Sequence, residues 1–346
     1  HYCVEFTRER DTCPEGQHCE AMPPLNDACE FQECGTCAEG DEVRRGLIGM
    51  YSSIAVTPSG EIWAAAYAAG TSYNRSYGDL AVARAEGRAG RIAVSSWTAI
   101  DGVPPDGASS GAASGWRGGT EEPGDDVGRY TSIAVDNAGN PSVAYYDTTN
   151  QALRFVIGGT EMWDQPVVVD GGDGSDAGRF ADLVILPSGN PAIAYMVIER
   201  NGDGSIVTRA RYIEGLNQSG TSWGSPVDIH VQDPTPCSMF VCSDDDDEVC
   251  DVEAGRCVVP DEDGCCTVPG EVGCGEESCL EDFACIGGTC REALTSAPDL
   301  PEGTGIWPDL ALGPGGTMGV VFYDRTNGNL MGASYDGSSW GAAQPL

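Results

Sequence analysis

A motif that occurs four times in the chain constrains its fold more than any other sequence feature. Each copy begins with an aromatic residue, continues with a short aliphatic run and ends in a glycine turn. The copies span residues 51–60, 130–139, 180–189 and 307–316. Such recurrence predicts a repeat architecture, because one unit alone cannot cover its own apolar faces and must stack on its neighbours.

The sequence within each copy indicates strands, because no stretch shows a convincing 3.6-residue apolar period. After the turn comes a second run rich in aromatic residues, such as 62–67 and 142–146. A third run follows around Leu80, Leu153, Ile206 and Leu330, and a tryptophan then opens a fourth, at Trp97, Trp163, Trp223 and Trp340. Four short strands per unit predict an all-β fold, a β-propeller with four recognisable four-stranded blades.

Two positions of the repeat have predicted structural roles. We expect each recurring tryptophan to fill the packing layer between blades. A glycine stands two residues before each aromatic residue, and these are Gly49, Gly128, Gly178 and Gly305. Because glycine adopts positive φ at no steric cost, we expect it to allow a tight entry into the first strand of the blade.

The second copy resembles a known repeat. Residues 124–147 read GDDVGRYTSIAVDNAGNPSVAYYD, a sequence similar to a repeat of many large secreted bacterial proteins. The resemblance implies propeller blades, usually without an assigned activity, so it concerns fold and not function. The cysteine-rich stretches of the chain are similar in composition to short Cys/Asp/Gly modules of surface proteins from myxobacteria-like bacteria.

The repeat and the cysteines divide the chain into four parts. Residues 1–45 form a cysteine-rich N-terminal module, 46–236 hold blades one to three, 237–290 are an acidic cysteine-rich insertion, and 291–346 hold blade four. We expect the blades at 46–101, 128–170, 178–231 and 303–346, with an acidic Gly/Ser loop at 102–127. Both ends of the insertion must return to the propeller, so we expect it to stand as a knob on one rim. The four units are expected to close, or nearly close, a small ring.

Sixteen cysteines lie in the two modules and nowhere else. The first six are Cys3, Cys13, Cys19, Cys29, Cys34 and Cys37, and the other ten are Cys237, Cys242, Cys250, Cys257, Cys265, Cys266, Cys274, Cys279, Cys285 and Cys290. Both modules are poor in large apolar residues, so we expect disulfides to replace a hydrophobic core in two largely irregular modules. Disulfides persist in oxidising compartments, which predicts a secreted, periplasmic or cell-surface protein.

Metal binding is an alternative use of some of these residues. Cys34 and Cys37 have the spacing of a zinc knuckle or a redox dithiol, although a single pair of this kind is weak evidence. His1 offers an amine and an imidazole for copper if it is the true N-terminus, which suggests a metal-binding surface protein as a further alternative.

The charge of the chain excludes some partners. It carries 54 acidic and 18 basic residues, a formal net charge of −36, and it contains no lysine. Phosphate backbones and anionic lipids need Lys/Arg patches, so we expect no nucleic-acid binding. The apolar runs are far shorter than the roughly 20 residues that cross a bilayer, so we expect no membrane insertion.

Acidic loops suggest calcium as a possible ligand, since calcium takes six to eight oxygen ligands and is abundant outside cells. Two loops alternate oxygen-bearing side chains with glycine, and an acidic run lies in the insertion. The candidate ligands are Asp170, Asp173, Asp176, Asn201, Asp203, Asp244, Asp245, Asp246, Asp247 and Glu248. An ordinary polar turn, or a solvated acidic run, explains the same residues without calcium.

These features favour a non-enzymatic binding or assembly module that displays acidic, disulfide-bonded knobs. Its partner is expected to be a protein or glycan at the cell surface or copies of the chain itself, as in an extracellular fibre or surface layer. The alternative is a carbohydrate-active hydrolase or lyase with its site in the propeller funnel. An enzyme should bring two or more carboxylates together with an Arg or Tyr at the axis, whereas a module should have an axis plugged by small residues or water.

Overall fold

A computed structural model describes most of the repeat region and part of the cysteine-rich insertion. The described residues are 47–72, 75–88, 91–94, 97–104, 123–159, 162–237, 242, 248–260, 283–286, 289–294 and 300–346. The predicted N-terminal module and most of the predicted loop at 102–127 lie outside these ranges.

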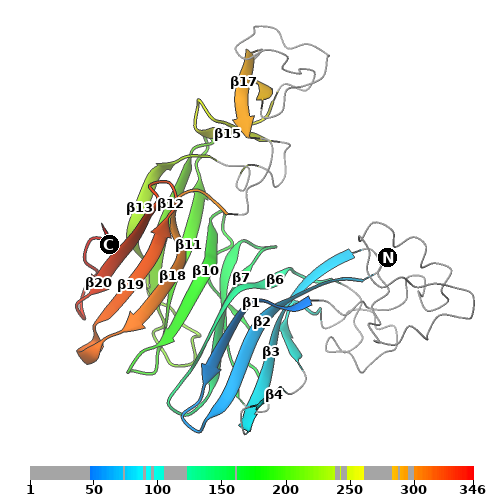
Figure 1. Cartoon of the computed structure of the whole chain (residues 1–346), viewed down its shortest axis with the longest axis vertical. Helices are drawn as coiled ribbons and strands as arrows, with labels where there is room; N and C mark the ends of the chain where they lie inside the picture. The colour runs from blue at the N-terminus through cyan, green and yellow to red at the C-terminus, as the bar shows by residue number, and fades with distance from the viewer. Residues whose placement is uncertain are drawn as a thin grey trace, which may run out of the picture.

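The repeats form four antiparallel sheets, each with its strands in chain order (Figure 1). Blade 1 consists of β1 (Leu47–Val56), β2 (Glu61–Ser72), β3 (Arg75–Arg88) and β4 (Arg91–Val94), with β5 (Thr98–Asp101) also paired to β3. Blade 2 consists of β6 (Val127–Val135), β7 (Pro141–Asp147), β8 (Ala152–Ile157) and β9 (Val167–Gly171). Blade 3 consists of β10 (Asp176–Ile185), β11 (Pro191–Arg200), β12 (Ile206–Glu214) and β13 (Val227–Thr235). Blade 4 consists of β18 (Thr304–Leu312), β19 (Met318–Asp324), β20 (Asn329–Tyr335) and β21 (Gln344–Pro345), with a 3₁₀ turn, η3 (Pro314–Gly316), between β18 and β19. The predicted all-β fold with four-stranded blades is confirmed.

A fifth sheet belongs to the cysteine-rich insertion. Its strands are β14 (Val249–Asp251), β15 (Arg256–Val258), β16 (Phe283–Ile286) and β17 (Thr289–Leu294), in the order β15-β14-β17-β16. Figure 1 shows this sheet projecting beyond the ends of β12 and β13, away from the four blades. The disulfides Cys237–Cys250 and Cys242–Cys257 tie residues that precede its first hairpin to β14 and β15, and Cys285 is also disulfide-bonded. These bonds indicate an oxidising compartment.

Each blade begins with a β-bulge at the glycine and the aromatic residue of the repeat. In blade 2 the register of β6 against β7 shifts on both sides of Arg129, where Gly128 has a φ of 98° and Tyr130 a φ of 53°. Gly178, the equivalent of Gly128 in blade 3, has a φ of 107°, and a Cβ there would lie 2.6 Å from the Cα of Leu153 in blade 2. The glycine therefore serves both the predicted positive φ and the close approach of the preceding blade.

The core lies between successive blades. β6 packs on β1, β2 and β3, β10 packs on β6, β7 and β8, and β18 packs on β10, β11 and β12. The tryptophans of the fourth runs in blades 2, 3 and 4 each contact an aromatic ring of the preceding blade. The ring centroids are 6.0 Å apart for Trp163–Trp63, 5.2 Å for Trp223–Phe155 and 5.2 Å for Trp340–Tyr212. The predicted packing role is confirmed for these three tryptophans, and it stays a prediction for Trp97.

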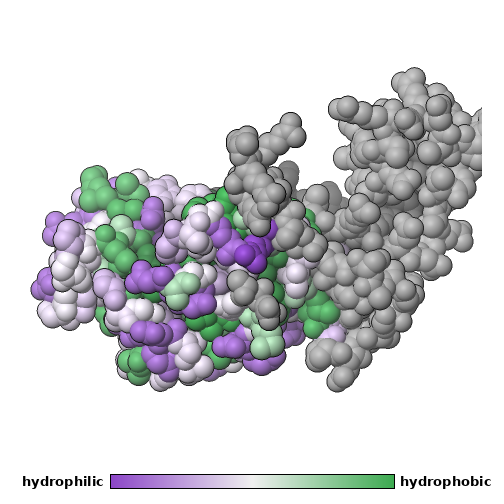
Figure 2. Space-filling view, turned by 90° about the horizontal axis from the view of Figure 1, so that it is seen from below, coloured by the Kyte–Doolittle hydropathy of each residue, from purple (hydrophilic) through white to green (hydrophobic). Residues whose placement is uncertain are grey.

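The four blades form an open arc. The first strands of neighbouring blades pack on each other, β6 on β1, β10 on β6 and β18 on β10. Among the described strands, no comparable packing joins β18 to β1. Figure 1 shows the blades fanning out from β1 to β20, and the expected closed ring is not seen. The face seen from below mixes hydrophobic and hydrophilic residues over the described part of the molecule (Figure 2). No helix among the described residues is long and apolar enough to cross a membrane.

Candidate functional site

The first strands bring the aromatic residues of the four repeats into one row. The ring centroids are 4.7 Å apart for Tyr51 and Tyr130, 4.4 Å for Tyr130 and Phe180, and 6.0 Å for Phe180 and Trp307. These four residues all have a positive φ, between 50° and 56°. Because the bulge re-aims each side chain away from its ordinary strand direction, rings from four sheets meet. The sequence placed these residues at equivalent positions, but it did not show that they touch.

Polar clusters flank the row at the junction between blades 1 and 2. The Tyr67 hydroxyl of β2 donates to Oδ1 of Asp126 at 2.8 Å, and the Arg129 guanidinium of β6 donates to Oδ2 at 2.9 Å. Arg129 also lies over the Tyr67 ring, 5.4 Å from its centroid. Burial, reinforced by the Asp126 carboxylate, raises the pKa of Tyr67 to about 12.

The same arrangement recurs between blades 2 and 3. Arg179 of β10 donates to Oδ2 of Asp176 at 2.8 Å, and its guanidinium lies 4.7 Å from the centroid of the Tyr146 ring. Burial and then the Asp176 carboxylate raise the pKa of Tyr146 above its ordinary value. Two carboxylates thus lie with Arg and Tyr beside the first strands, which is the kind of grouping expected of an enzyme.

The charged groups of these clusters are paired with one another. Both carboxylates accept charge-assisted hydrogen bonds from arginine. Tyr67 and Tyr146 have raised pKa values, so their hydroxyls stay protonated to a higher pH than that of an ordinary tyrosine. The junction between blades 3 and 4 has an apolar pair at this place. Ile306 holds the repeat position of Arg129 and Arg179, and it packs in one core cluster with Met196.

A second set of contacts links the first strands directly. The backbone N–H of Ile133 donates to Ser53 Oγ at 3.1 Å, that of Leu183 to Ser132 Oγ at 3.0 Å, and that of Leu310 to Asp182 Oδ2 at 2.7 Å. In each case the acceptor residue lies two positions after the aromatic residue of the repeat in its own blade. Burial raises the pKa of Asp182, and hydrogen bonds from Leu310 and Ser132 oppose part of that rise.

The candidate calcium ligands of blades 2 and 3 hydrogen-bond to different protein groups. Asp170 accepts from the Tyr195 hydroxyl at 2.5 Å and from Arg211 at 3.1 Å, and Asp176 is paired with Arg179 as described above. Asp173 accepts from Ser175, while Asn201 and Asp203 hydrogen-bond to Ser205 across the β11–β12 turn. Among the described residues there is no group of three or more His, Cys, Asp or Glu side chains that could hold a metal ion.

The remaining candidate ligands and alternative metal residues are placed as follows. Glu248 forms an ion pair with Arg200. Asp244, Asp245, Asp246 and Asp247 lie outside the described residues, as do His1, Cys34 and Cys37. Calcium therefore stays a prediction, as do the zinc and copper alternatives.

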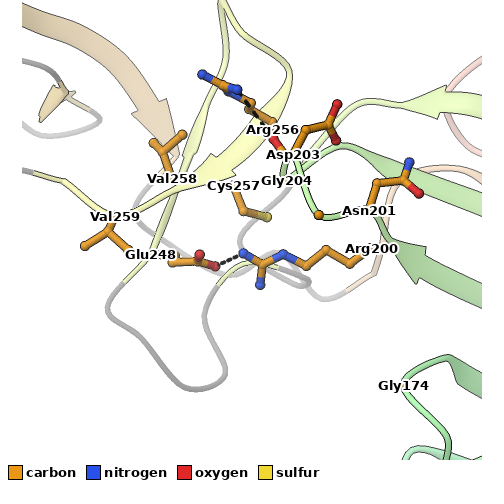
Figure 3. A pocket seen from close by; sticks show the side chains of 11 residues that line it. Gly174, Arg200, Asn201, Asp203, Gly204, Glu248, Arg256, Cys257, Val258 and Val259 are labelled. Carbon is orange, nitrogen blue, oxygen red and sulfur yellow. Dashed lines mark hydrogen bonds and ion pairs between the residues drawn. The ribbon is translucent and has the colours of Figure 1, made fainter.

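A shallow polar groove separates blade 3 from the knob, by which we mean residues 237–294. The structure describes residues 237, 242, 248–260, 283–286 and 289–294 of the knob. It has a volume of about 730 Å³ and lies between the β11–β12 turn and the β14–β15 hairpin (Figure 3). Its wall on the blade side includes Arg200, Asn201 and Asp203, and its wall on the knob side includes Glu248 and Arg256. The Arg200–Glu248 ion pair crosses it (Figure 3).

The knob is fixed to blade 3 by several kinds of contact. The N–H of Cys257 donates to the carbonyl of Gly204 at 3.2 Å, and Arg256 donates to the carbonyl of Asp203 at 3.4 Å. Both disulfides join one core cluster with residues of blade 3, including Met196 and Ile206. Sequence reasoning predicted a knob on the rim, but it did not predict a core shared with the blade.

Comparison with known proteins adds no family. No protein-family model matches the chain, and no curated protein matches it. Among solved structures it is similar to a Hadza microbial sialidase, at 12% identity and a TM-score of 0.37 over 86% of this chain and 58% of that one. It is also similar to an ulvan lyase, a polysaccharide lyase, at 9% identity and a TM-score of 0.40 over 90% of this chain and 60% of that one.

A third similar structure is an α-L-arabinofuranosidase of Fusarium graminearum, at 10% identity and a TM-score of 0.36 over 86% of this chain and 77% of that one. The chain spans less than two thirds of the length of the first two structures it matches, the sialidase and a β-1,3-galactosidase. At these TM-scores the similarity carries no argument about activity. The propeller-like arrangement is assigned from the four sheets themselves.

Proposed function

We propose that the chain is a secreted or cell-surface, non-enzymatic binding module that holds an acidic knob in a fixed position on a propeller-like scaffold. The observation that carries this proposal is the attachment of the knob to blade 3 through a shared core, two hydrogen bonds to backbone carbonyls and an ion pair. A knob fixed in this way presents one surface to a partner without the entropic cost of ordering a loose module.

The charge of the insertion points to the class of partner. Residues 237–290 hold 15 acidic residues and one arginine, which makes −14 of the −36 net charge. Such a surface attracts a protein whose contact face is rich in Lys and Arg, and it repels acidic glycans and nucleic acids. The groove beside Arg200 and Glu248 offers a defined edge against which such a partner could be oriented.

The polar clusters beside the aromatic row support the absence of enzymatic chemistry. A glycosidase needs one carboxyl group free to donate a proton and a second group free to attack or activate water. Asp126 and Asp176 instead accept hydrogen bonds from arginine, and the nearby tyrosines have raised pKa values. A carbohydrate-active enzyme is the second candidate, favoured by the aromatic row itself, whose end residue Trp307 is exposed.

Binding of an oligoarginine peptide, measured by calorimetry at about 0.15 M salt, tests the role of the knob. Replacing Asp244, Asp245, Asp246 and Asp247 by Asn should weaken binding about tenfold, which is 1.4 kcal/mol. The matched control replaces four exposed carboxylates outside the knob, Asp164, Asp173, Asp233 and Asp336, by Asn. An equal loss in both variants would mean that total charge, and not the knob, governs binding.

The enzymatic alternative is tested with a panel of glycosidic and uronic-acid substrates. We expect no turnover by the wild-type protein. Turnover that disappears in the Asp126→Asn or Asp176→Asn variant, while their thermal unfolding is unchanged, would instead assign a catalytic role to the clusters beside the aromatic row.

A further inference from the structure

Two Asn-Gly pairs occur in the chain, and the structure places them in different environments. They are Asn201-Gly202 in the β11–β12 turn and Asn327-Gly328 in the β19–β20 turn. Such a pair is prone to react with itself, because glycine has no Cβ to keep its backbone nitrogen away from the asparagine side chain. Whether the reaction takes place in the folded protein depends on how firmly the amide and the glycine N–H are held.

Asn327-Gly328 is held at both reacting groups. Asn327 Nδ2 donates to Asp324 Oδ2 at 2.8 Å and to Gln232 Oε1 at 3.1 Å, and Asp324 is buried. The Gly328 N–H donates to the carbonyl of Arg325 at 3.2 Å. The side-chain amide and the glycine nitrogen of this pair are therefore both kept away from each other.

Asn201-Gly202 is held much less firmly. Both residues are exposed, and a Cβ at Gly202 would meet nothing within 4 Å. Asn201 Nδ2 donates to Ser205 Oγ at 2.9 Å, a neutral partner in a contact open to solvent. Within the described part of the chain, no group accepts a hydrogen bond from the Gly202 N–H. The nitrogen that would attack the amide is therefore accessible to water and base.

We propose that Asn201 deamidates spontaneously in the folded protein and that the reaction loosens the attachment of the knob. The Gly202 nitrogen loses its proton to hydroxide or water and forms a bond to Cγ of Asn201. The Cγ–Nδ2 bond breaks, ammonia leaves, and a cyclic succinimide joins the two residues. Water then opens the ring, so water is consumed, ammonia is released, and neither an oxidant nor a reductant is needed.

The product depends on which bond water opens. Opening at Cγ leaves an ordinary aspartate at position 201. Opening at the former main-chain carbonyl carbon leaves an isoaspartate, whose main chain runs through Cβ and Cγ and is longer by a carbon atom. Both products replace a neutral amide with a carboxylate in the groove between blade 3 and the knob, which Asn201 lines.

The isoaspartate changes the turn that contacts the knob. In the unmodified chain the Gly204 N–H donates to the carbonyl of Asn201 at 2.9 Å and closes the turn. That carbonyl is no longer part of the main chain in the isoaspartate, so the turn must rearrange. Gly204 lies close to Cys257 of the knob (Figure 3), and its carbonyl accepts from the Cys257 N–H at 3.2 Å. Since a Cβ at Gly204 would lie 2.6 Å from the Cys257 carbonyl oxygen, a rearranged turn cannot keep this contact.

The reaction needs no partner, so its test is independent of the proposed binding role. The full chain is incubated in its folded state at mildly alkaline pH, and the peptides that contain each Asn-Gly pair are followed by mass spectrometry. Deamidation at Asn201 should be at least about tenfold faster than at Asn327, which is about 1.4 kcal/mol in activation free energy. Isomerisation of Asp203 leaves the mass unchanged, so it cannot imitate the signal.

The same chain, unfolded, is the matched control. In guanidinium chloride both pairs lose their contacts, so the two asparagines should deamidate at similar rates. Gly202→Ala should slow the reaction at Asn201 about tenfold, because the added methyl group hinders the attacking nitrogen. Gly202 is without a positive φ and has open space around its Cβ position, so this variant should fold. If thermal unfolding shows that it does not, Asn201→Gln replaces it, because glutamine must close a larger ring.

The effect on the knob is measured by hydrogen exchange at the Cys257 N–H. Exchange should be faster in aged wild-type protein than in fresh protein, whereas aged Gly202→Ala protein should keep the rate of its fresh form. Three results would overturn the proposal. They are an Asn327 that reacts as fast as Asn201 in the folded protein, a ratio of the two rates that unfolding leaves unchanged, and deamidated protein with unaltered exchange at Cys257.

Discussion

The backbone N–H of Leu310 in blade 4 donates a 2.7 Å hydrogen bond to the carboxylate of Asp182 in blade 3. The other oxygen of the same carboxylate accepts from the Ser132 hydroxyl of blade 2 at 3.0 Å. One half-buried acidic side chain therefore joins three successive blades. Its contacts explain why an aspartate, costly to bury, is found on a first strand facing apolar neighbours.

Shortening this side chain should destabilise the propeller more than neutralising it. Asp182→Ala leaves the Leu310 N–H without its acceptor, which should cost about 1–3 kcal/mol in the free energy of unfolding. Asp182→Asn keeps an acceptor for Leu310 and should change it by less than about 1 kcal/mol. Urea unfolding of both variants measures the difference, and equal losses would show that the charge, not the hydrogen bond, matters.

The raised pKa of Asp182 has a definite consequence for the pH dependence of stability. The folded state holds the proton more tightly than the unfolded state, whose pKa is near 3.8. The contribution of Asp182 to the free energy of unfolding is therefore largest below that value, and it falls as pH rises through the folded pKa. The difference between wild type and Asp182→Asn, measured by urea unfolding from about pH 3 to pH 7, should show this fall.

Other carboxylates titrate over the same range, so the wild-type curve alone cannot isolate the effect. Subtracting the curve of Asp182→Asn removes their contributions, since the two proteins share them. A difference that is flat with pH would contradict a raised pKa at this position.

Gly178 and Gly174 form a matched pair for testing the close approach between blades. Their φ angles are 107° and 108°, so alanine meets the same backbone strain at both. A Cβ at Gly178 would lie 2.6 Å from the Cα of Leu153, whereas nothing lies within 4 Å of one at Gly174. Gly178→Ala should lower stability by roughly 2 kcal/mol more than Gly174→Ala, as measured by thermal unfolding.

Removal of the Cys242–Cys257 disulfide should loosen the knob and leave the blades folded. The bond closes a loop with a sequence separation of 15, which corresponds to about 3 kcal/mol in the chain-entropy model. The double substitution of both cysteines by Ala should therefore open the segment around β14 and β15 to limited proteolysis. Protease cleavage that begins in blades 1 and 2 instead would show that the knob supports the whole scaffold.

Calcium remains to be tested at the acidic run of the insertion. If the run at 244–248 binds calcium, a hundredfold excess of the ion over Kd should add about 2.7 kcal/mol to the free energy of unfolding. The midpoint of thermal unfolding should rise accordingly. Replacing Asp244, Asp245, Asp246 and Asp247 by Asn should abolish the rise. A calcium-dependent shift that survives this replacement would place the ion elsewhere.

The amino-acid sequence is sufficient to define the repeating unit of this protein. The glycine, the aromatic residue and the aliphatic run recur at a constant spacing, and a tryptophan follows later in each unit. This local pattern is sufficient to predict four-stranded blades, the packing of Trp163, Trp223 and Trp340, and the positive φ of glycines such as Gly128. The cysteines likewise predicted disulfides and a compartment, because both follow from composition.

The way in which the units meet follows from contacts between blades. The contacts of Asp182, the pairing of Asp126 with Arg129 and Tyr67, and the meeting of four rings join residues from different blades. No local pattern encodes those distances. The open arc could not be predicted from the sequence either, because the same repeat motif is compatible with a closed ring or with an open arc. The exposure of Ile54 depends on what packs against blade 1.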